Sequence, residues 1–369
     1  MARRNGPPEG PGDELSVHEL IEGPTEVLSA DALAAIRRPE PPGHDLSTEQ
    51  THDLSAYAAS DEATHDLSGH AGPDEATRDL SGHAGTAARR RVELPRMPVV
   101  GALYRRALLG ALPGAGAGRR AAEAPAVELA VGGTAVDRTH LADYDRVCGF
   151  RLTDRLPATF PHVMGFPLAL RLMTAPEFPI PLTGVVHVGN RITVHRPIGA
   201  DEVLDFTTYA ERLRPHDRGR QIDVVLVGSV GGEEVWRGVS TYLGRSGGPG
   251  GGRRDGGERP PAPAGSARWR VEPRVGTDYA RVSGDRNPIH TSRLGARLFG
   301  FPRPIAHGMW SKARCLAALE NRLPDAYTVE VAFKLPVPLP GTVTFSLLPA
   351  GGFALHDPRG RPHLAGLVR

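Results

Sequence analysis

The chain repeats itself, and this repetition restricts the folds open to it more than any other feature. The segment 144–150 (YDRVCGF) matches 279–285 (YARVSGD) at its tyrosine, arginine, valine and glycine. Each segment precedes an apolar, helix-like run, 163–173 in the first copy and 309–319 in the second. Each run precedes alternating apolar and polar residues, which are typical of a half-buried strand. We therefore predict two copies of one fold.

Each copy is predicted to wrap several antiparallel strands around its helix. The run 309–319 is apolar or small on nearly every face, with Lys312 and Arg314 as exceptions, so this helix should be largely buried. A buried helix inside an antiparallel sheet is the hot-dog arrangement, so the fold class is α+β, a double hot-dog. The predicted strands are 186–195, 203–210, 221–230 and 235–243 in the first copy, and 328–337, 342–347, 352–356 and 363–368 in the second.

Composition divides the chain into four parts. Residues 1–91 are poor in large apolar side chains and repeat Asp-Leu-Ser, so we expect a disordered, low-complexity tail. A Gly/Arg/Pro-rich segment, 246–265, is typical of a flexible linker. The two copies then occupy 95–245 and 266–369. The Asp-Leu-Ser repeats begin at Asp45, Asp53, Asp66 and Asp79.

Charge and cysteine content exclude several classes of protein. With 44 basic and 42 acidic residues, the formal charge of +2 is too small to favour nucleic acid as a partner. The sequence contains no apolar run long enough to cross a bilayer, so no membrane partner is expected. Only Cys148 and Cys315 are present, so a disulfide framework is not expected and a reducing cytoplasm fits.

The segment 279–309 concentrates groups that can do chemistry. Asp285, Asn287 and His290 fall within six residues, and a second histidine, His307, is followed by Gly308. Three simpler interpretations stay open for these residues. The acid and the amide can cap a turn, the imidazole can be a satisfied buried histidine, and Asp285, His290 and His307 can form a zinc site.

This segment resembles the signature of the MaoC-like (R)-specific enoyl-thioester hydratases and 3-hydroxyacyl-thioester dehydratases. That signature reads Asp-x-Asn-Pro-(Ile/Leu)-His, followed by Pro-Ile-x-His-Gly-Met, and every part is present from Asp285 to Met309. The resemblance covers the chain from about Pro95 to its C-terminus. It implies a lyase that interconverts (3R)-3-hydroxyacyl and trans-2-enoyl thioesters, with Asp285, Asn287, His290 and Gly308 in the site. It implies no metal and no redox cofactor.

The residues support this chemistry independently. Adding or removing water beside a thioester needs one group to accept a proton and one to deliver it, and Asp285 and His290 supply both. Pro288 restricts the loop between them. Charge that develops on the thioester oxygen needs donors, and Gly308 begins a buried helix whose first N–H groups have no partner within the helix. His307 is predicted to be a supporting residue.

The first copy lacks the residues that correspond to this motif. Phe150 stands where the second copy has Asp285, no Asn-Pro-Ile-His follows, and Val163 stands in place of the glycine, while His162 corresponds to His307. This copy is therefore predicted to be non-catalytic.

The alternatives are a hot-dog thioesterase and a non-catalytic acyl-binding or assembly subunit. The resemblance implies an acyl thioester of coenzyme A or acyl carrier protein as the partner. Two copies in one chain predict a monomer by internal pairing, or a homodimer. The sequence does not choose the carrier, the acyl-chain length or the direction of the reaction.

Overall fold

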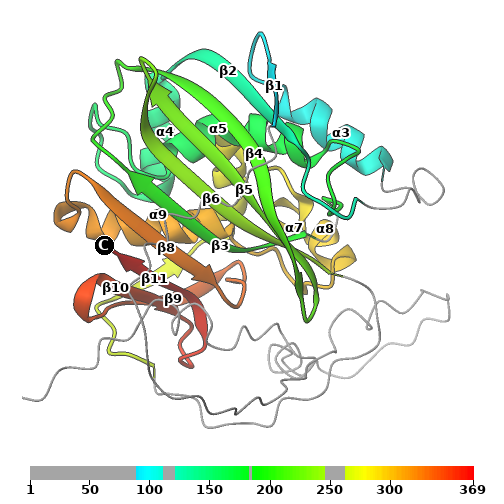
Figure 1. The fold of residues 1–369 in the computed structure, drawn as a ribbon. Helices are drawn as coiled ribbons and strands as arrows, with labels where there is room; N and C mark the ends of the chain where they lie inside the picture. The colour runs from blue at the N-terminus through cyan, green and yellow to red at the C-terminus, as the bar shows by residue number, and fades with distance from the viewer. Residues whose placement is uncertain (1–88, 111–120, 183–184, 246–261) are drawn as a thin grey trace, which may run out of the picture.

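One continuous eleven-stranded sheet organises the molecule (Figure 1). The computed structural model describes residues 89–110, 121–182, 185–245 and 262–369, with side chains except at 106–110 and 245. The hydrogen-bonded strand order is β1-β2-β4-β5-β6-β3-β8-β11-β10-β9-β7. β1 pairs with β2 in parallel, and the other neighbouring strands are antiparallel. Most of the predicted tail (1–88) and of the predicted linker (246–261) lies outside the described residues.

The first half of the sheet surrounds helix α5. This helix is apolar on nearly every face, and Phe160, Leu168, Leu170 and Leu172 on it are buried. It packs against strands β2, β4 and β5. The elements of this half are β1 Arg90–Glu93, α3 Val100–Gly110, β2 Val127–Ala135, α4 Arg138–Cys148, α5 Phe160–Met173, β3 Val185–Val194, β4 Val203–His216, β5 Gly219–Val230 and β6 Glu233–Arg245.

The second half repeats this plan around helix α9. Its buried residues include Met309, Trp310, Cys315 and Leu316. The elements are β7 Ala267–Val271, α6 Val275–Ser283, α7 Pro288–Thr291, α8 Arg293–Leu298, α9 Gly308–Leu319, the 3₁₀ turn η2 Glu320–Arg322, β8 Tyr327–Phe333, β9 Gly341–Leu347, the 3₁₀ turn η3 Pro349–Gly351, β10 Gly352–His356 and β11 Pro362–Val368. None of the helices in the described ranges is long and apolar enough to cross a bilayer.

The two halves join edge to edge through β3 and β8. Asn190 pairs with Val331 in this antiparallel ladder. Beneath the ladder, the fully buried Lys312 of α9 extends its ammonium to Asn190 Oδ1 at 2.6 Å, to Asn190 O at 3.2 Å and to Val329 O at 3.1 Å. Burial lowers the pKa of Lys312 well below its usual value. The junction therefore depends on a buried polar contact as well as on the strand ladder.

The repeated sequence segments meet inside the molecule. Helices α4 and α6 carry the matched tyrosines, Tyr144 and Tyr279, whose ring centroids lie 6.2 Å apart in the core. Each helix ends at a glycine with positive φ, Gly149 at 82° and Gly284 at 74°. That conformation suits glycine because it carries no Cβ.

The predicted strands and both central helices are confirmed, with one correction. Strand β8 ends at Phe333, whereas the alternation predicted a strand as far as 337. Pro336 and Pro338 have no N–H to donate, so the ladder cannot continue through them. The turn 357–360 closes the β10–β11 hairpin, with Gly360 N donating to Asp357 O. The structure also contains three strands that were not predicted, β1, β2 and β7. Of these, β1 begins at Arg90, inside the last residues of the predicted tail.

Candidate active site

The sharp turn after α6 determines where Asp285 lies. Helix α6 ends at Ser283, and Gly284 N donates to Ala280 O in the left-handed conformation that closes the helix. Asp285 N then donates to Ser283 Oγ at 3.2 Å. The Asp285 side chain is 30% exposed, so it is partly accessible from outside the core.

The next three residues position His290 through a capped turn. Asn287 Oδ1 accepts the N–H of Ile289 at 3.3 Å, and Pro288 occupies the first position of α7, where its missing N–H costs nothing. His290 follows within the same short helix and is buried. Its Nδ1 lies 2.8 Å from Ile305 O, so Nδ1 carries the proton and Nε2 is free to accept one.

His307 and Gly308 form the start of α9. His307 Nε2 donates to the backbone oxygen of Asp285 at 3.0 Å. This hydrogen bond connects the start of α9 to the turn that carries Asp285. Its side chain does not cap the helix. The space beside Gly308 is tight, because an added Cβ would meet the ring of Phe333 at 3.1–3.2 Å. The N–H groups at this helix start point outward without a helical acceptor.

The structure brings the predicted acid and imidazole together. Single side-chain atoms of Asp285, His290 and His307 lie within 4.8 Å of one another. The rings of His290 and His307 stack with centroids 3.7 Å apart, and His307 also contacts Tyr279 at 4.9 Å. Asp285 Oδ2 lies 3.9 Å from His307 Nε2. Asn287 caps the turn between the acid and the imidazole.

The surroundings favour an ionised acid and neutral imidazoles. Burial by itself raises the pKa of Asp285, but His307 and His290 act against burial and the net pKa is lowered. Hydrogen bonds from Tyr104 and from Asn287 N lower it further. Burial lowers the pKa of His290, and it lowers the pKa of His307 to about 3. A carboxylate therefore faces two imidazoles that hold no extra proton at neutral pH.

The same three residues also satisfy the spacing of a metal site, but their orientation fits poorly. His290 Nδ1 and His307 Nε2 both contact backbone carbonyls, which leaves one nitrogen on each ring. A metal lies in the plane of each imidazole that binds it, about 2.0–2.1 Å from the nitrogen. Two rings that stack with an angle of 26° between their planes do not converge on one point at that distance.

Several residues of the first half, none of them predicted from the sequence, also lie at this site. Tyr104 of α3 donates its hydroxyl to Asp285 Oδ1 at 2.6 Å. His187 of β3 stacks on Tyr242 of β6 at 4.7 Å and meets the edge of Phe333 at 5.0 Å. Phe333 is the ring that lies against Gly308. These side chains come from segments far apart in the chain, so no local sequence motif predicts that they meet.

The first half has no carboxylate at the position that matches Asp285. Phe150 follows the αL glycine of α4 and is buried, at the position that corresponds to Asp285. His162 lies in the first turn of α5, as His307 lies at the start of α9, and burial lowers its pKa to about 4. It lies 6.5 Å from His187, ring to ring.

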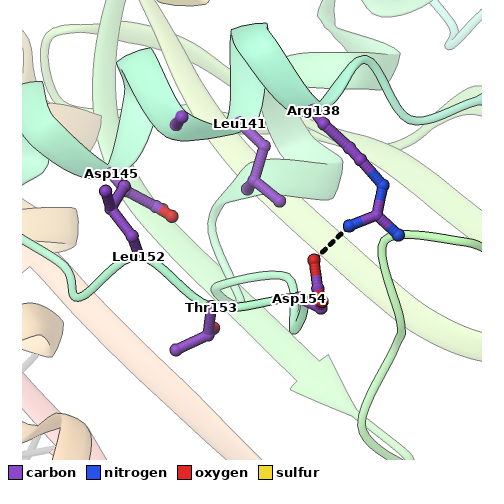
Figure 2. A pocket seen from close by; sticks show the side chains of 7 residues that line it. Arg138, Leu141, Asp145, Leu152, Thr153 and Asp154 are labelled. Carbon is purple, nitrogen blue, oxygen red and sulfur yellow. Dashed lines mark hydrogen bonds and ion pairs between the residues drawn. The ribbon is translucent and has the colours of Figure 1, made fainter.

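A separate pocket of about 290 Å³ lies beside α4 (Figure 2). Leu141 and Leu152 form part of its wall, and Arg138 and Asp154 are ion-paired across it. Asp145 lines it as well, with a pKa raised to about 7 by burial and by Glu320. None of its lining residues belongs to the Asp285 cluster.

Comparison with known proteins gives a consistent result. The profile of the family described as MaoC like domain matches residues 263–352. The chain is 37% identical over 273 residues to 3-hydroxyacyl-thioester dehydratase X of Mycobacterium tuberculosis, covering 72% of this chain and 95% of that protein. It is 28% identical over 197 residues to Enoyl-CoA hydratase ChsH3 of the same organism, covering 49% of this chain and 66% of ChsH3.

Solved structures agree. The crystal structure of HtdX of Mycobacterium tuberculosis matches with a TM-score of 0.58 and 36% identity, over 66% of this chain and 99% of that one. A MaoC-like dehydratase from Phytophthora capsici matches with a TM-score of 0.51 and 19% identity, over 65% of this chain and 94% of that one. The second likeness concerns the fold alone. With the double hot-dog fold, the intact motif and a relative matched over nearly its whole length, the chain belongs to the MaoC-like family.

Proposed function

We propose that this protein is a 3-hydroxyacyl-thioester dehydratase, which interconverts (3R)-3-hydroxyacyl and trans-2-enoyl thioesters. The observation that carries the proposal is the cluster of Asp285, His290 and His307 at the start of the buried helix α9. The similarity to dehydratase X of Mycobacterium tuberculosis supports the reaction class. The (R) configuration rests on the resemblance of the Asp285–His290 motif to the (R)-specific enzymes.

In the elimination, the Cα–H and Cβ–O bonds break and the Cα=Cβ bond forms. The neutral Nε2 of His290 and the carboxylate of Asp285 are the two groups that accept and return protons. One of them takes the α-proton, and the leaving hydroxyl takes a proton from the pair and departs as water. The pair regains its starting protonation at the end, so no other reactant is needed. Hydration runs through the same steps in reverse.

The start of α9 supplies electrostatic stabilisation. As the α-proton leaves, negative charge develops on the thioester oxygen. The N–H of Gly308 and the positive end of the helix dipole suit that oxygen. A Cβ at this position would already crowd the Phe333 ring at 3.1–3.2 Å, so glycine fits beside that ring without displacing it.

We propose that the second half, 266–369, is catalytic and that the first, 95–245, is not. Phe150 at the position of Asp285 supports this division. The direct join of β3 and β8 supports a monomer as the working unit, because each half already has its partner. Both cysteines are free and buried, which supports a reducing compartment such as the cytoplasm.

The test is turnover of crotonyl-CoA and longer trans-2-enoyl-CoAs, followed by the loss of conjugated absorbance. Asp285→Asn and His290→Ala should each lower kcat by about 10²–10⁴-fold. The matched controls are Asp278→Asn, on the exposed side of α6, and His195→Ala, whose ring is 44% exposed beside Glu234. Equal rates in all five proteins would refute the assigned pair. Release of free thiol without change at the alkene would instead support a thioesterase.

A further inference from the structure

Tyr104 makes the contact that connects the first half to the acid of the site. Its hydroxyl donates to Asp285 Oδ1 at 2.6 Å across 181 residues of sequence. That distance is typical of an O–H donor on an ionised carboxylate, which is among the stronger hydrogen bonds in proteins. Burial, and then the negative charge of Asp285, raise the pKa of Tyr104 far above its usual 10, so the hydroxyl keeps its proton.

Helix α3 is held against the turn that presents Asp285. Leu103, the residue before Tyr104, is 7% exposed. One turn of helix earlier, Val100 Cγ2 lies 3.5 Å from the point where a Cβ on Gly284 would stand. The phenol is therefore attached to a segment that packs directly beside the acid. Its position does not depend on the hydrogen bond alone.

The two carboxylate oxygens of Asp285 make different contacts. Oδ1 accepts two donors, the hydroxyl of Tyr104 at 2.6 Å and the N–H of Asn287 at 3.2 Å. Oδ2 lies toward the imidazoles, 3.9 Å from His307 Nε2. Because Oδ1 is held by two hydrogen bonds, the carboxylate cannot rotate freely about χ2. The orientation of Oδ2 is therefore fixed as well.

We propose that Tyr104 is a positioning residue that fixes the carboxylate of Asp285 through Oδ1 and leaves Oδ2 as the oxygen that exchanges protons with the substrate. The inference rests on the proposed function. It means that the half without an acid–base pair still controls the chemistry of the other half. The tyrosine itself does not act as an acid, since its neighbours disfavour loss of its proton.

The first experiment is Tyr104→Phe, which removes only the hydroxyl. We expect kcat to fall by about 10- to 100-fold, the scale of one hydrogen bond to a charged group, with KM changed by no more than about twofold. The matched control is Tyr209→Phe, on β4, whose hydroxyl accepts from Arg237 Nη1 at 3.2 Å. It should leave both constants near those of the wild type.

A double-mutant cycle separates positioning from general support. If Tyr104 acts through the carboxylate, Tyr104→Phe should cause little further loss in an Asp285→Asn background. A full and independent loss in that background would overturn the proposal. An unchanged kcat in the single variant, with the wild type active, would overturn it as well.

A carboxyl ¹³C NMR titration tests the contact without any turnover, with Asp285 assigned by its absence in Asp285→Asn. Losing a donor to the ionised form should raise the pKa of Asp285 by about one unit in Tyr104→Phe. An equal pKa in both proteins would refute the contact. An inactive wild type that still shows the shift would refute the proposed function but keep the coupling. The titratable groups that sense Asp285 are Tyr104, His162, His187, Tyr242, Tyr279, His290 and His307.

Discussion

The imidazole rings of His290 and His307 stack face to face, with their centroids 3.7 Å apart. Stacked rings do not direct their nitrogens at a common metal, so turnover should be independent of metal ions. We expect protein treated with a chelator and then dialysed to keep its full rate. Elemental analysis should find only substoichiometric zinc. Loss of activity on chelation, followed by recovery with added Zn²⁺, would contradict this.

The lowered pKa values of the site predict the pH dependence of the rate. A base works only while it is unprotonated, so activity falls as the pH drops through its pKa in the folded protein. Because burial lowers the pKa of His290 below 6.5, kcat/KM should stay level from about pH 8 down to about pH 6.5 and decline only in more acidic solution. A profile of kcat/KM measured against pH checks this. An acid limb centred above pH 7 would show that a different group limits the reaction.

Gly308→Ala should impair catalysis more than folding. The new methyl group would meet the Phe333 ring at 3.1–3.2 Å and displace it beside the N–H that we propose for the thioester oxygen. We expect kcat/KM to fall by about 10- to 100-fold, as a small misplacement of the substrate does. The free energy of unfolding should change by no more than about 1 kcal/mol, because better helix propensity offsets the crowding.

The control for this substitution is Gly101→Ala, in the first turn of α3, where an added Cβ has no atom within 4 Å. Its rate and its stability should match or slightly exceed those of the wild type. A normal rate for Gly308→Ala would remove the glycine from the site. A large loss of stability in Gly308→Ala would show that its lower rate comes from disturbed packing.

Lys312→Met should weaken the junction between the halves. The change leaves Asn190 Oδ1, Asn190 O and Val329 O without the ammonium that they now accept from. We expect the free energy of unfolding to fall by about 2–4 kcal/mol in denaturant titrations, the scale of several buried acceptors left unpaired. Adding Asn190→Val should cost less than the sum of the single changes, because it removes one orphaned acceptor. Strict additivity would argue against direct coupling.

Sequence reasoning predicted that Asp285 and His290 lie close together because the signal is local. Asp285 and His290 are five residues apart, and Pro288 restricts the geometry of the turn between them, so their proximity follows from the chain itself. The place of Asn287 in the site, which the resemblance implies, stays a prediction. Its observed hydrogen bond, from Ile289 N, is the N-cap that the turn interpretation also anticipated.

The remaining contributors could not be read from the chain in this way. Tyr104 precedes Asp285 by 181 residues, and only the docking of α3 brings the two together. His187 occupies a polar position of an alternating strand, and nothing in that pattern distinguishes a residue near the site from a solvated one. Strand β1 was missed because four residues with mostly exposed side chains carry almost no periodic signal. Such features arise from tertiary packing, which a single sequence does not display.

The edge-to-edge join of β3 and β8 has one more consequence. In a symmetric homodimer every substitution occurs in both subunits, so the two copies of the fold cannot differ in sequence. A tandem chain is free of that constraint. One half can keep a carboxylate while the other carries phenylalanine at the matching position, and either can be redesigned alone. Residues of the half that carries phenylalanine can therefore change while Asp285 and His290 stay the same.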